Sequence, residues 1–166
     1  MKSVRYILST MCDGGGVESF FENAAAQLMR AGWTVELAVL GRYDSSLVQR
    51  HRKCGIAVSC FTDGTKKDTF FSLLFQYPAL KRFLRAEPGL ITHMNTCSHS
   101  VVIVLHCLKA LGCRVRILHS HTSPAENLSL LRRLRYAAVR QYAQKTATKM
   151  VACSKAAAYF LFPQKQ

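Results

Sequence analysis

The sequence predicts an α/β domain with a doubly wound, mostly parallel sheet of about six strands. Short apolar runs of strand length alternate with longer amphipathic segments, and strand starts recur about every 25 to 35 residues. This spacing is typical of strand–helix–strand units, in which helices cover both faces of a parallel sheet. Hydrophobic residues make up 49% of the chain and charged residues 19%, which argues against disorder. The 166 residues fit a single domain over 1–166.

The first half of the chain contains three predicted strands and two regular helices. Strands are predicted at residues 4–10, 34–40 and 57–61. Apolar positions at helical spacing predict helices over 17–31 and 45–53, and a glycine follows each of them closely enough to end it.

A further helical stretch covers residues 70–84. Asp68 and Thr69 can cap its start, and Pro78 interrupts it, so we expect a kink or two short helices there. Its predicted inner face comprises Phe70, Phe71, Leu74, Tyr77, Leu80 and Leu84.

The second half continues the alternation. Three more strands are predicted at 90–94, 114–119 and 150–153, with helices at 98–111 and 125–146 and a last helix between Ser154 and Pro163. On the long helix 125–146 the predicted apolar stripe is Leu128, Leu131, Leu134, Ala138 and Tyr142.

Charge and cysteine content restrict the class of protein. The net charge of +14 arises from 23 Lys and Arg against 9 Asp and Glu, and it attracts phosphorylated molecules, nucleic acid or an anionic membrane. The seven cysteines are odd in number and form no C-x-x-C pair, which favours reduced thiols over disulfides or zinc ligation. Neither a signal peptide nor an apolar run of membrane-spanning length is evident. We therefore expect a cytoplasmic protein.

A glycine turn follows the first predicted strand and opens the first helix. Gly14, Gly15 and Gly16 precede Val17 and Glu18. Glycines allow close backbone approach, and a helix N-terminus attracts anions, so a phosphate or a sugar could bind here; a simple turn without a ligand is the alternative. The pattern is neither G-x-G-x-x-G nor a P-loop.

Histidines stand at the carboxyl ends of the fourth and fifth predicted strands. His119 and His121 should point the same way by strand alternation, and His93 and Asn95 occupy the corresponding place one strand earlier. Ligands of open parallel sheets bind beyond these strand ends, where an imidazole can bind a hydroxyl or transfer a proton. Histidines that only stabilise a turn are the alternative. No metal-ligand spacing is present, so no metal is expected.

The long helix carries many cations with almost no acid after Glu126. These cations include Arg132, Arg133, Arg135 and Arg140. Such a run is usually a solvated face, but its imbalance favours contact with an anionic membrane surface. Nucleic acid is a weaker interpretation, because aromatic residues are not interleaved with the cations.

Three segments resemble bacterial family 4 glycosyltransferases, particularly those of exopolysaccharide and capsule synthesis. Gly15-Gly16-Val17-Glu18 resembles their GGVE segment, and the sequence RILHSH at 116–121 resembles a strand end of the form R-I-x-H-S-H. The segment 147–157, ATKMVACSKAA, resembles their A-T-x-x-x-A-C-S-x-x-A. The three occur in the family's order and span essentially the whole chain.

The resemblance implies the acceptor-side, Rossmann-like half of a GT-B fold. In that family a second domain binds the nucleotide sugar through an E-x7-E motif, and transfer retains anomeric configuration without an obligatory metal or other cofactor. By residue match, Gly15 and Gly16 would lie near the donor phosphates, and His121 would contact the transferred sugar with His119 beside it. Thr122 stands where relatives commonly have Asn, and Phe160 to Pro163 replaces their W-L-F-G.

No E-x7-E pair is present in the chain. We therefore expect a fragment, the product of a truncated reading frame or one half of a split enzyme, inactive without a donor-binding half. The predicted function is transfer of a sugar from a nucleotide-sugar donor to a saccharide or lipid-linked acceptor in cell-surface polysaccharide synthesis, at the inner face of the plasma membrane. The alternatives are a non-catalytic module that docks an anionic membrane or partner through its basic helix, and a nucleic-acid-binding α/β protein.

Overall fold

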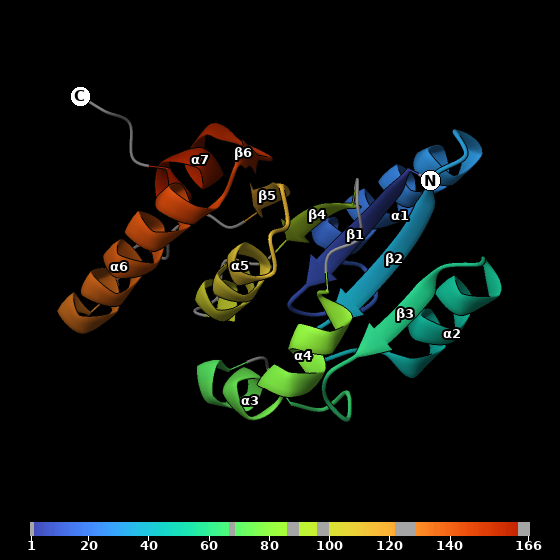
Figure 1. Ribbon diagram of the computed structural model, residues 1–166, viewed down its shortest axis with the longest axis horizontal. Helices are drawn as coiled ribbons and strands as arrows, with labels where there is room; N and C mark the ends of the chain where they lie inside the picture. The colour runs from blue at the N-terminus through green and yellow to red at the C-terminus, as the bar shows by residue number, and fades with distance from the viewer. Residues whose placement is uncertain (1, 67–68, 86–89, 96–99, 122–128, 163–166) are drawn as a thin grey trace.

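Six parallel strands form one sheet in the described part of the chain (Figure 1). The computed structural model describes residues 2–66, 69–85, 90–95, 100–121 and 129–162. The strands are β1 (Ser3–Leu8), β2 (Thr34–Val39), β3 (Ala57–Cys60), β4 (Leu90–Asn95), β5 (Val115–Ser120) and β6 (Lys149–Ala152). Their order in the sheet is β3-β2-β1-β4-β5-β6. The predicted doubly wound α/β fold is confirmed.

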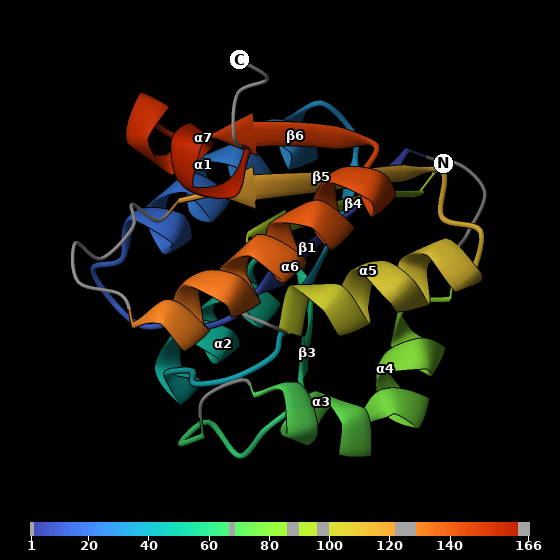
Figure 2. The same ribbon diagram turned by 90° about the vertical axis from the view of Figure 1, so that its left-hand side faces the viewer.

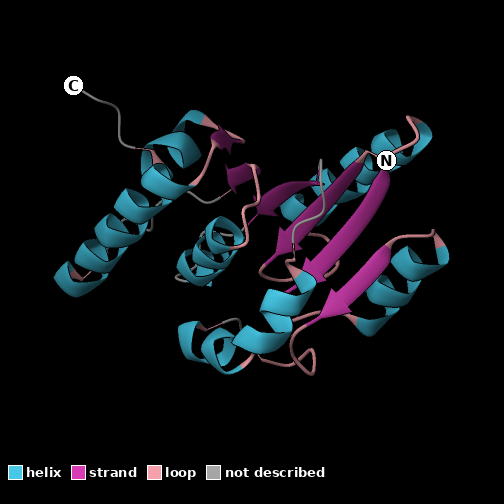
Figure 3. Ribbon diagram, viewed as in Figure 1, coloured by secondary structure: helices cyan, strands magenta, loops and turns pink. Residues whose placement is uncertain are grey.

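Seven helices are seen in the described residues (Figure 3). They are α1 (Gly16–Arg30), α2 (Ser45–Lys53), α3 (Phe70–Phe75), α4 (Tyr77–Phe83), α5 (Ser100–Ala110), α6 (Leu130–Thr146) and α7 (Lys155–Leu161). Figure 2 shows α5 and α6 side by side, and they pack against each other. The residues from 125 to 128, predicted as the first turn of the long helix, lie outside the described part.

Two apolar cores lie on opposite faces of the sheet. On one face Phe21 and Ala25 of α1 and Leu47 of α2 pack against strands β1, β2 and β3. On the other face α3 to α7 cover the sheet, and α5 contributes more buried residues to that core than any other element. All six residues of β1 are buried, because this strand lies inside the sheet and is covered on both faces.

Local capping explains several helix boundaries. The Asp44 side chain accepts a hydrogen bond from the backbone N–H of Ser46 at 2.7 Å, which satisfies one free donor at the start of α2. Thr69 and Ser72 form a reciprocal capping box at α3. Pro78 stands in the first turn of α4, where proline is tolerated, so the predicted pair of short helices is confirmed.

Two predicted inner faces are partly wrong. In the stretch 70–84, Leu80 and Leu84 are buried as predicted, but Phe71 and Leu74 are exposed and Leu73 is buried instead. The break before Pro78 splits the stretch into two helices, so a single helical stripe does not hold across it.

The predicted stripe on the long helix is also partly wrong, although Tyr142 packs against the core as predicted. Leu131 and Leu134 are 59% and 60% exposed, whereas Val139 and Ala143 are buried. Among the described residues, the buried apolar side chains of α6 come from its second half, where Val139 and Ala143 join the core that α5 dominates. Leu128 lies outside the described residues.

Two further observations concern redox state and the membrane. Six cysteines in the described segments are free thiols. Among the helices that the structure describes, none has both the length and the apolar content that crossing a bilayer requires.

Candidate functional site

The glycine turn places the start of α1 at the carboxyl end of β1. Gly14 has a φ of +79°, and Gly15 is the N-cap residue of α1 without a side-chain cap. Glu18, in the first turn of the helix, folds back so that its Oε1 accepts a hydrogen bond from the Cys12 N–H at 3.1 Å. A carboxylate at this position is favourable because the N-terminus of a helix carries partial positive charge.

Three histidines meet at the carboxyl ends of β4 and β5, and we call them the histidine cluster: His93 in β4, His119 in β5 and His121 directly after β5. The His93 Nε2 and His119 Nδ1 atoms are 3.2 Å apart and share a hydrogen bond. The ring centres of His119 and His121 are 3.9 Å apart. His121 Nε2 is bonded to Asn95 Oδ1 at 2.8 Å, so the imidazole donates through Nε2 and keeps Nδ1 as an acceptor.

Aromatic side chains from the first third of the chain enclose this cluster. Phe20 of α1 contacts all three rings, with centre-to-centre distances of 5.7 Å to His93, 4.8 Å to His119 and 5.5 Å to His121. Tyr6 of β1 stacks on His93 at 5.0 Å. These contacts fix the ring orientations and remove water from one side of the cluster.

The surroundings keep the cluster uncharged at neutral pH. Burial, together with the neighbouring rings of His119 and His121, lowers the pKa of His93 to about 4. Burial, and then His121, lowers the pKa of His119 to about 4. Burial also lowers the pKa of His121, but the Glu18 carboxylate opposes that shift. His121 is thus the ring in the cluster whose charged form has a neighbouring counter-ion.

Two buried polar atoms of this site lack a hydrogen-bond partner within the described part of the chain. They are Nε2 of His119 and Nδ2 of Asn95, in side chains that are 4% and 5% exposed as residues. An unsatisfied buried polar group costs about 1–3 kcal/mol. A polar ligand bound at this site could supply the missing partners.

The structure brings together most of the residues that the sequence singled out. His93, His119, His121 and Asn95 are in contact, and Glu18 is close enough to His121 to influence its charge. The described basic residues of α6 do not join them: Arg133 and Arg135 are exposed on a different helix, and Arg140 is half-buried. The side chain of Arg132 lies outside the described residues. No group of three or more potential metal ligands is arranged for a metal ion among the residues that the structure describes.

Phe20 and Tyr6 were missed as site residues from the sequence. Phe20 was predicted only as an apolar helix position, and Tyr6 only as part of a strand. The one signal in the sequence was that Phe20 and Phe21 are adjacent and so point in different directions from the helix. In the structure Phe21 is fully buried, and half-buried Phe20 contacts both the core and the histidine rings.

Comparison with known proteins assigns the chain to a family. Residues 14–162 match Glycosyltransferase Family 4. The chain belongs to glycosyltransferase family 4. The matched range contains the glycine turn, the histidine cluster and α6.

Structural comparison gives the same class of fold. A crystal structure of MurG from Acinetobacter baumannii matches the family 4 domain with a TM-score of 0.60 at 15% sequence identity. The match covers 100% of this chain but only 44% of the MurG chain. No match was found among curated proteins. The likeness supports the GT-B type of α/β fold.

In the family 4 domain, the histidine cluster occupies the position where parallel α/β sheets bind ligands. β1 and β4 are adjacent strands with a crossover between them, so the loops beyond them diverge to opposite faces. The site residues come from β1, α1, β4 and the end of β5, and they gather near the carboxyl ends of these strands. Neutral imidazoles at such a position can donate hydrogen bonds to hydroxyl groups and accept them. Because these rings carry no charge, they do not require a bound counter-ion.

Proposed function

We propose that this family 4 chain is the acceptor-side domain of a glycosyltransferase that transfers a sugar, with retention, from a nucleotide sugar to a saccharide or lipid-linked acceptor. Cell-surface polysaccharide synthesis is the proposed setting. The observation that carries the proposal is the contact of His93, His119, His121 and Asn95 beside the first turn of α1. The proposed cofactor requirement is none, since the site chemistry rests on neutral imidazole and amide groups.

His121 is the proposed contact to the transferred sugar. Its Nε2 is committed to Asn95, which leaves Nδ1 as a hydrogen-bond acceptor. Glu18 stabilises any positive charge that the ring gains when it accepts a proton from a hydroxyl group. The groups that bind donor phosphates would be Gly15 and Gly16, at the N-terminus of α1, together with a donor-binding domain.

The proposed acceptor is membrane-associated, and the exposed face of α6 supports this part. Leu130, Leu131 and Leu134 are between 59% and 72% exposed, and Arg133 and Arg135 lie among them. Exposed leucines that alternate with arginines suit the boundary between anionic headgroups and acyl chains. The net charge of +14 would strengthen that attraction.

A reconstituted transfer assay tests the function. The chain is mixed with the donor-binding domain of a family 4 glycosyltransferase, radiolabelled nucleotide sugars and lipid-linked saccharides, and label in the lipid fraction is counted. We expect transfer by the mixture and none by either part. His121→Ala should lower turnover roughly 100-fold or more, because it removes a group that contacts the reacting sugar. His119→Ala should have a smaller effect.

His106→Ala is the matched control. His106 is an exposed histidine of α5 that bonds to the Tyr142 hydroxyl, outside the histidine cluster. Its loss should leave turnover unchanged, with circular dichroism confirming that each variant is folded. Full activity of His121→Ala would refute the role of His121, and strong transfer by the chain alone would refute the need for a donor-binding half.

A further inference from the structure

A hollow at the β3 edge of the sheet, distant from the histidine cluster, is the second candidate site in the molecule. We call it the edge cavity. Its volume is about 890 Å³, and it is bounded by β3, by the loop from Phe61 to Lys66, and by α3 and α4. This volume lies within the usual range of small-molecule sites, about 300–1,000 Å³. In the sheet order β3 is three positions from β4 and four from β5, which at about 4.8 Å per strand separates the two sites by roughly 14 to 19 Å.

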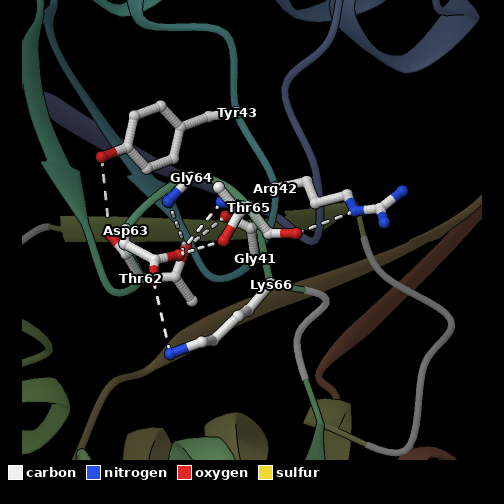
Figure 4. Close-up of polar contacts among 8 residues, drawn as sticks. All are labelled: Gly41, Arg42, Tyr43, Thr62, Asp63, Gly64, Thr65 and Lys66. Carbon is white, nitrogen blue, oxygen red and sulfur yellow. Dashed lines mark hydrogen bonds and ion pairs between the residues drawn. The ribbon is translucent and has the colours of Figure 1, made fainter.

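The loop that forms the rim of the edge cavity is fixed to the neighbouring β2–α2 connection (Figure 4). The Thr62 hydroxyl donates to the Gly41 carbonyl at 2.7 Å, and the Tyr43 N–H donates to the Gly64 carbonyl at 3.1 Å. Within the rim, the Asp63 carboxylate accepts hydrogen bonds from the Thr65 backbone N–H at 3.1 Å and from the Thr65 hydroxyl at 2.8 Å.

Gly64 is required by this arrangement. Its φ is +88°, and a Cβ atom there would lie 3.2 Å from the Tyr43 ring and 3.3 Å from its carbonyl oxygen. The rim is therefore built in one conformation before any ligand arrives. A ligand that binds a pre-formed rim does not have to order it, which favours binding.

Cations outnumber acids around the edge cavity. Arg52, Lys66 and Arg82 line it, and Asp63 is the one acid among the described lining residues. Asp63 is paired with Lys66 at 3.3 Å, and Arg52 donates to the Val58 carbonyl at 3.0 Å. After that pairing a net charge of about +2 remains, so the cavity attracts an anion.

The rest of the lining is polar on one part and aromatic on another. Ser59 and Gln76 offer hydroxyl and amide groups that can exchange hydrogen bonds with a hydroxylated ligand, whereas the Ser72 hydroxyl is used in the capping box of α3. Phe61 and Phe83 pack edge to face at 5.6 Å and form an apolar wall. A lining with a few polar groups beside aromatic surface orients a small ligand as well as holding it.

We propose that the edge cavity binds a phosphorylated sugar. The arginines and lysine would hold the phosphate, since guanidinium groups match its oxygens in geometry and charge. The hydroxyl and amide groups would bind the sugar hydroxyls, and the phenylalanines would cover the apolar face of the ring. This site is independent of the proposed transfer reaction, and its test uses neither a nucleotide sugar nor an acceptor.

The test is titration of the 166-residue chain with glucose 1-phosphate, with inorganic phosphate and glucose as comparison ligands. Calorimetry gives the affinities, and amide NMR shifts locate the site. We expect glucose 1-phosphate to bind more tightly than either comparison ligand and to shift amides of β3, the 61–66 loop and α4. Arg82→Gln and Lys66→Gln should each weaken binding about fivefold or more, because each removes a charged hydrogen-bond donor.

Arg30→Gln is the matched control, since it removes the same charge from an exposed position in the last turn of α1, outside the edge cavity. It should leave the affinity unchanged. The proposal is overturned if glucose 1-phosphate does not bind, if the shifts lie outside the edge cavity, or if Arg30→Gln weakens binding as much as Arg82→Gln. Equal affinity for inorganic phosphate and glucose 1-phosphate would overturn the assignment to a sugar. Thermal melting curves check that the variants are folded. If Arg82→Gln does not fold, Lys66→Gln still tests the proposal.

Discussion

Glu18 links the glycine turn to the histidine cluster through a single side chain. Its Oε1 accepts the Cys12 N–H, and its carboxylate opposes the lowering of the His121 pKa. A Cβ atom on Gly15 would lie 1.9 Å from Glu18 Oε2, so the space left by the missing side chain is filled from within the molecule. Without any ligand, the absence of a side chain at Gly15 already allows the Glu18 carboxylate to lie against the first turn of α1.

Gly15→Ala tests this coupling. The φ of −81° suits alanine, and the clashing atom is the tip of a flexible side chain, so we expect a loss of stability below about 1 kcal/mol. The Glu18 carboxylate must move, however, and His121 loses its counter-ion. Turnover in the reconstituted assay should therefore fall to the level of Glu18→Gln.

Gly16→Ala is the control for that variant, because nothing lies within 4 Å of a Cβ at Gly16. It should not displace Glu18. If Gly15→Ala keeps full turnover while Glu18→Gln loses it, the link between the glycine and the carboxylate is wrong.

Residue-level prediction from the sequence succeeded where strand alternation applies. His119 and His121 were predicted to share a direction, and their rings are in contact. The contact of Asn95 with His121 required knowledge of which strands are adjacent, which no local pattern contains. The enclosure by Phe20 required the position of α1 over the sheet, and this is set by the packing of Phe21.

Helix α6 is divided into a packed half and an exposed half. Val139 and Ala143 enter the core, whereas Leu130, Leu131 and Leu134 are exposed among arginines. The sequence predicted one continuous stripe because it assumed that the whole helix lies on the domain. Within the part of the chain that the structure describes, no side chain buries the leucines of the first half.

Co-sedimentation with vesicles tests the exposed half of α6. The chain should bind anionic vesicles at low salt and release as ionic strength rises, because exposed charges are screened. The double variant Leu131→Ser, Leu134→Ser should bind less while its melting temperature stays the same, since both side chains are exposed.

The charge-neutralised variant Arg133→Gln, Arg135→Gln separates the two contributions, because it leaves the leucines in place. It should reduce binding at low salt and flatten the salt dependence. Equal binding to neutral and anionic vesicles would contradict a role for the arginines, and unchanged binding of the leucine variant would contradict insertion.

For the whole molecule, the large positive net charge and the buried histidines both make the stability of the fold decrease in acid. The pKa values of His93 and His119 are about 4 in the folded chain, against an ordinary value near 6.5. Below pH 6.5 the unfolded chain therefore binds more protons than the folded one. Stability is fully present above pH 6.5 and declines as the pH falls toward 4, while the net charge rises above +14.

Melting temperatures between pH 7.5 and 4 measure this decline. His51 and His121 add to it, because burial lowers the pKa of each of them as well. His93→Phe removes one of the rings that burial keeps neutral and should flatten the curve. NMR titration of the imidazoles should leave His93 and His119 uncharged until about pH 4. A stability that does not change between pH 6.5 and 4 would contradict the neutral cluster.

The fold as a whole was predictable, because each strand and helix carries its own periodic signal and the crossovers of parallel sheets follow general rules. The two sites differ in this respect. The histidine cluster lies at strand ends, where the sequence could point to it. The edge cavity combines β3, the 61–66 loop, α3 and α4 through side chains that no periodicity relates, and only the folded chain brings them together.

The placement of β1 inside the sheet has a consequence for synthesis. β1 pairs with β2 on one side, and on the other side Ser3 pairs with Leu90 and Leu8 with Asn95. While the ribosome is still making the middle of the chain, the nascent strands β1, β2 and β3 can pair, but the second edge of β1 stays open. Such an edge is a template for pairing with other chains, and long-range closure is slow. The interval between translation of β1 and of β4 is therefore the period in which a chaperone would protect this protein most.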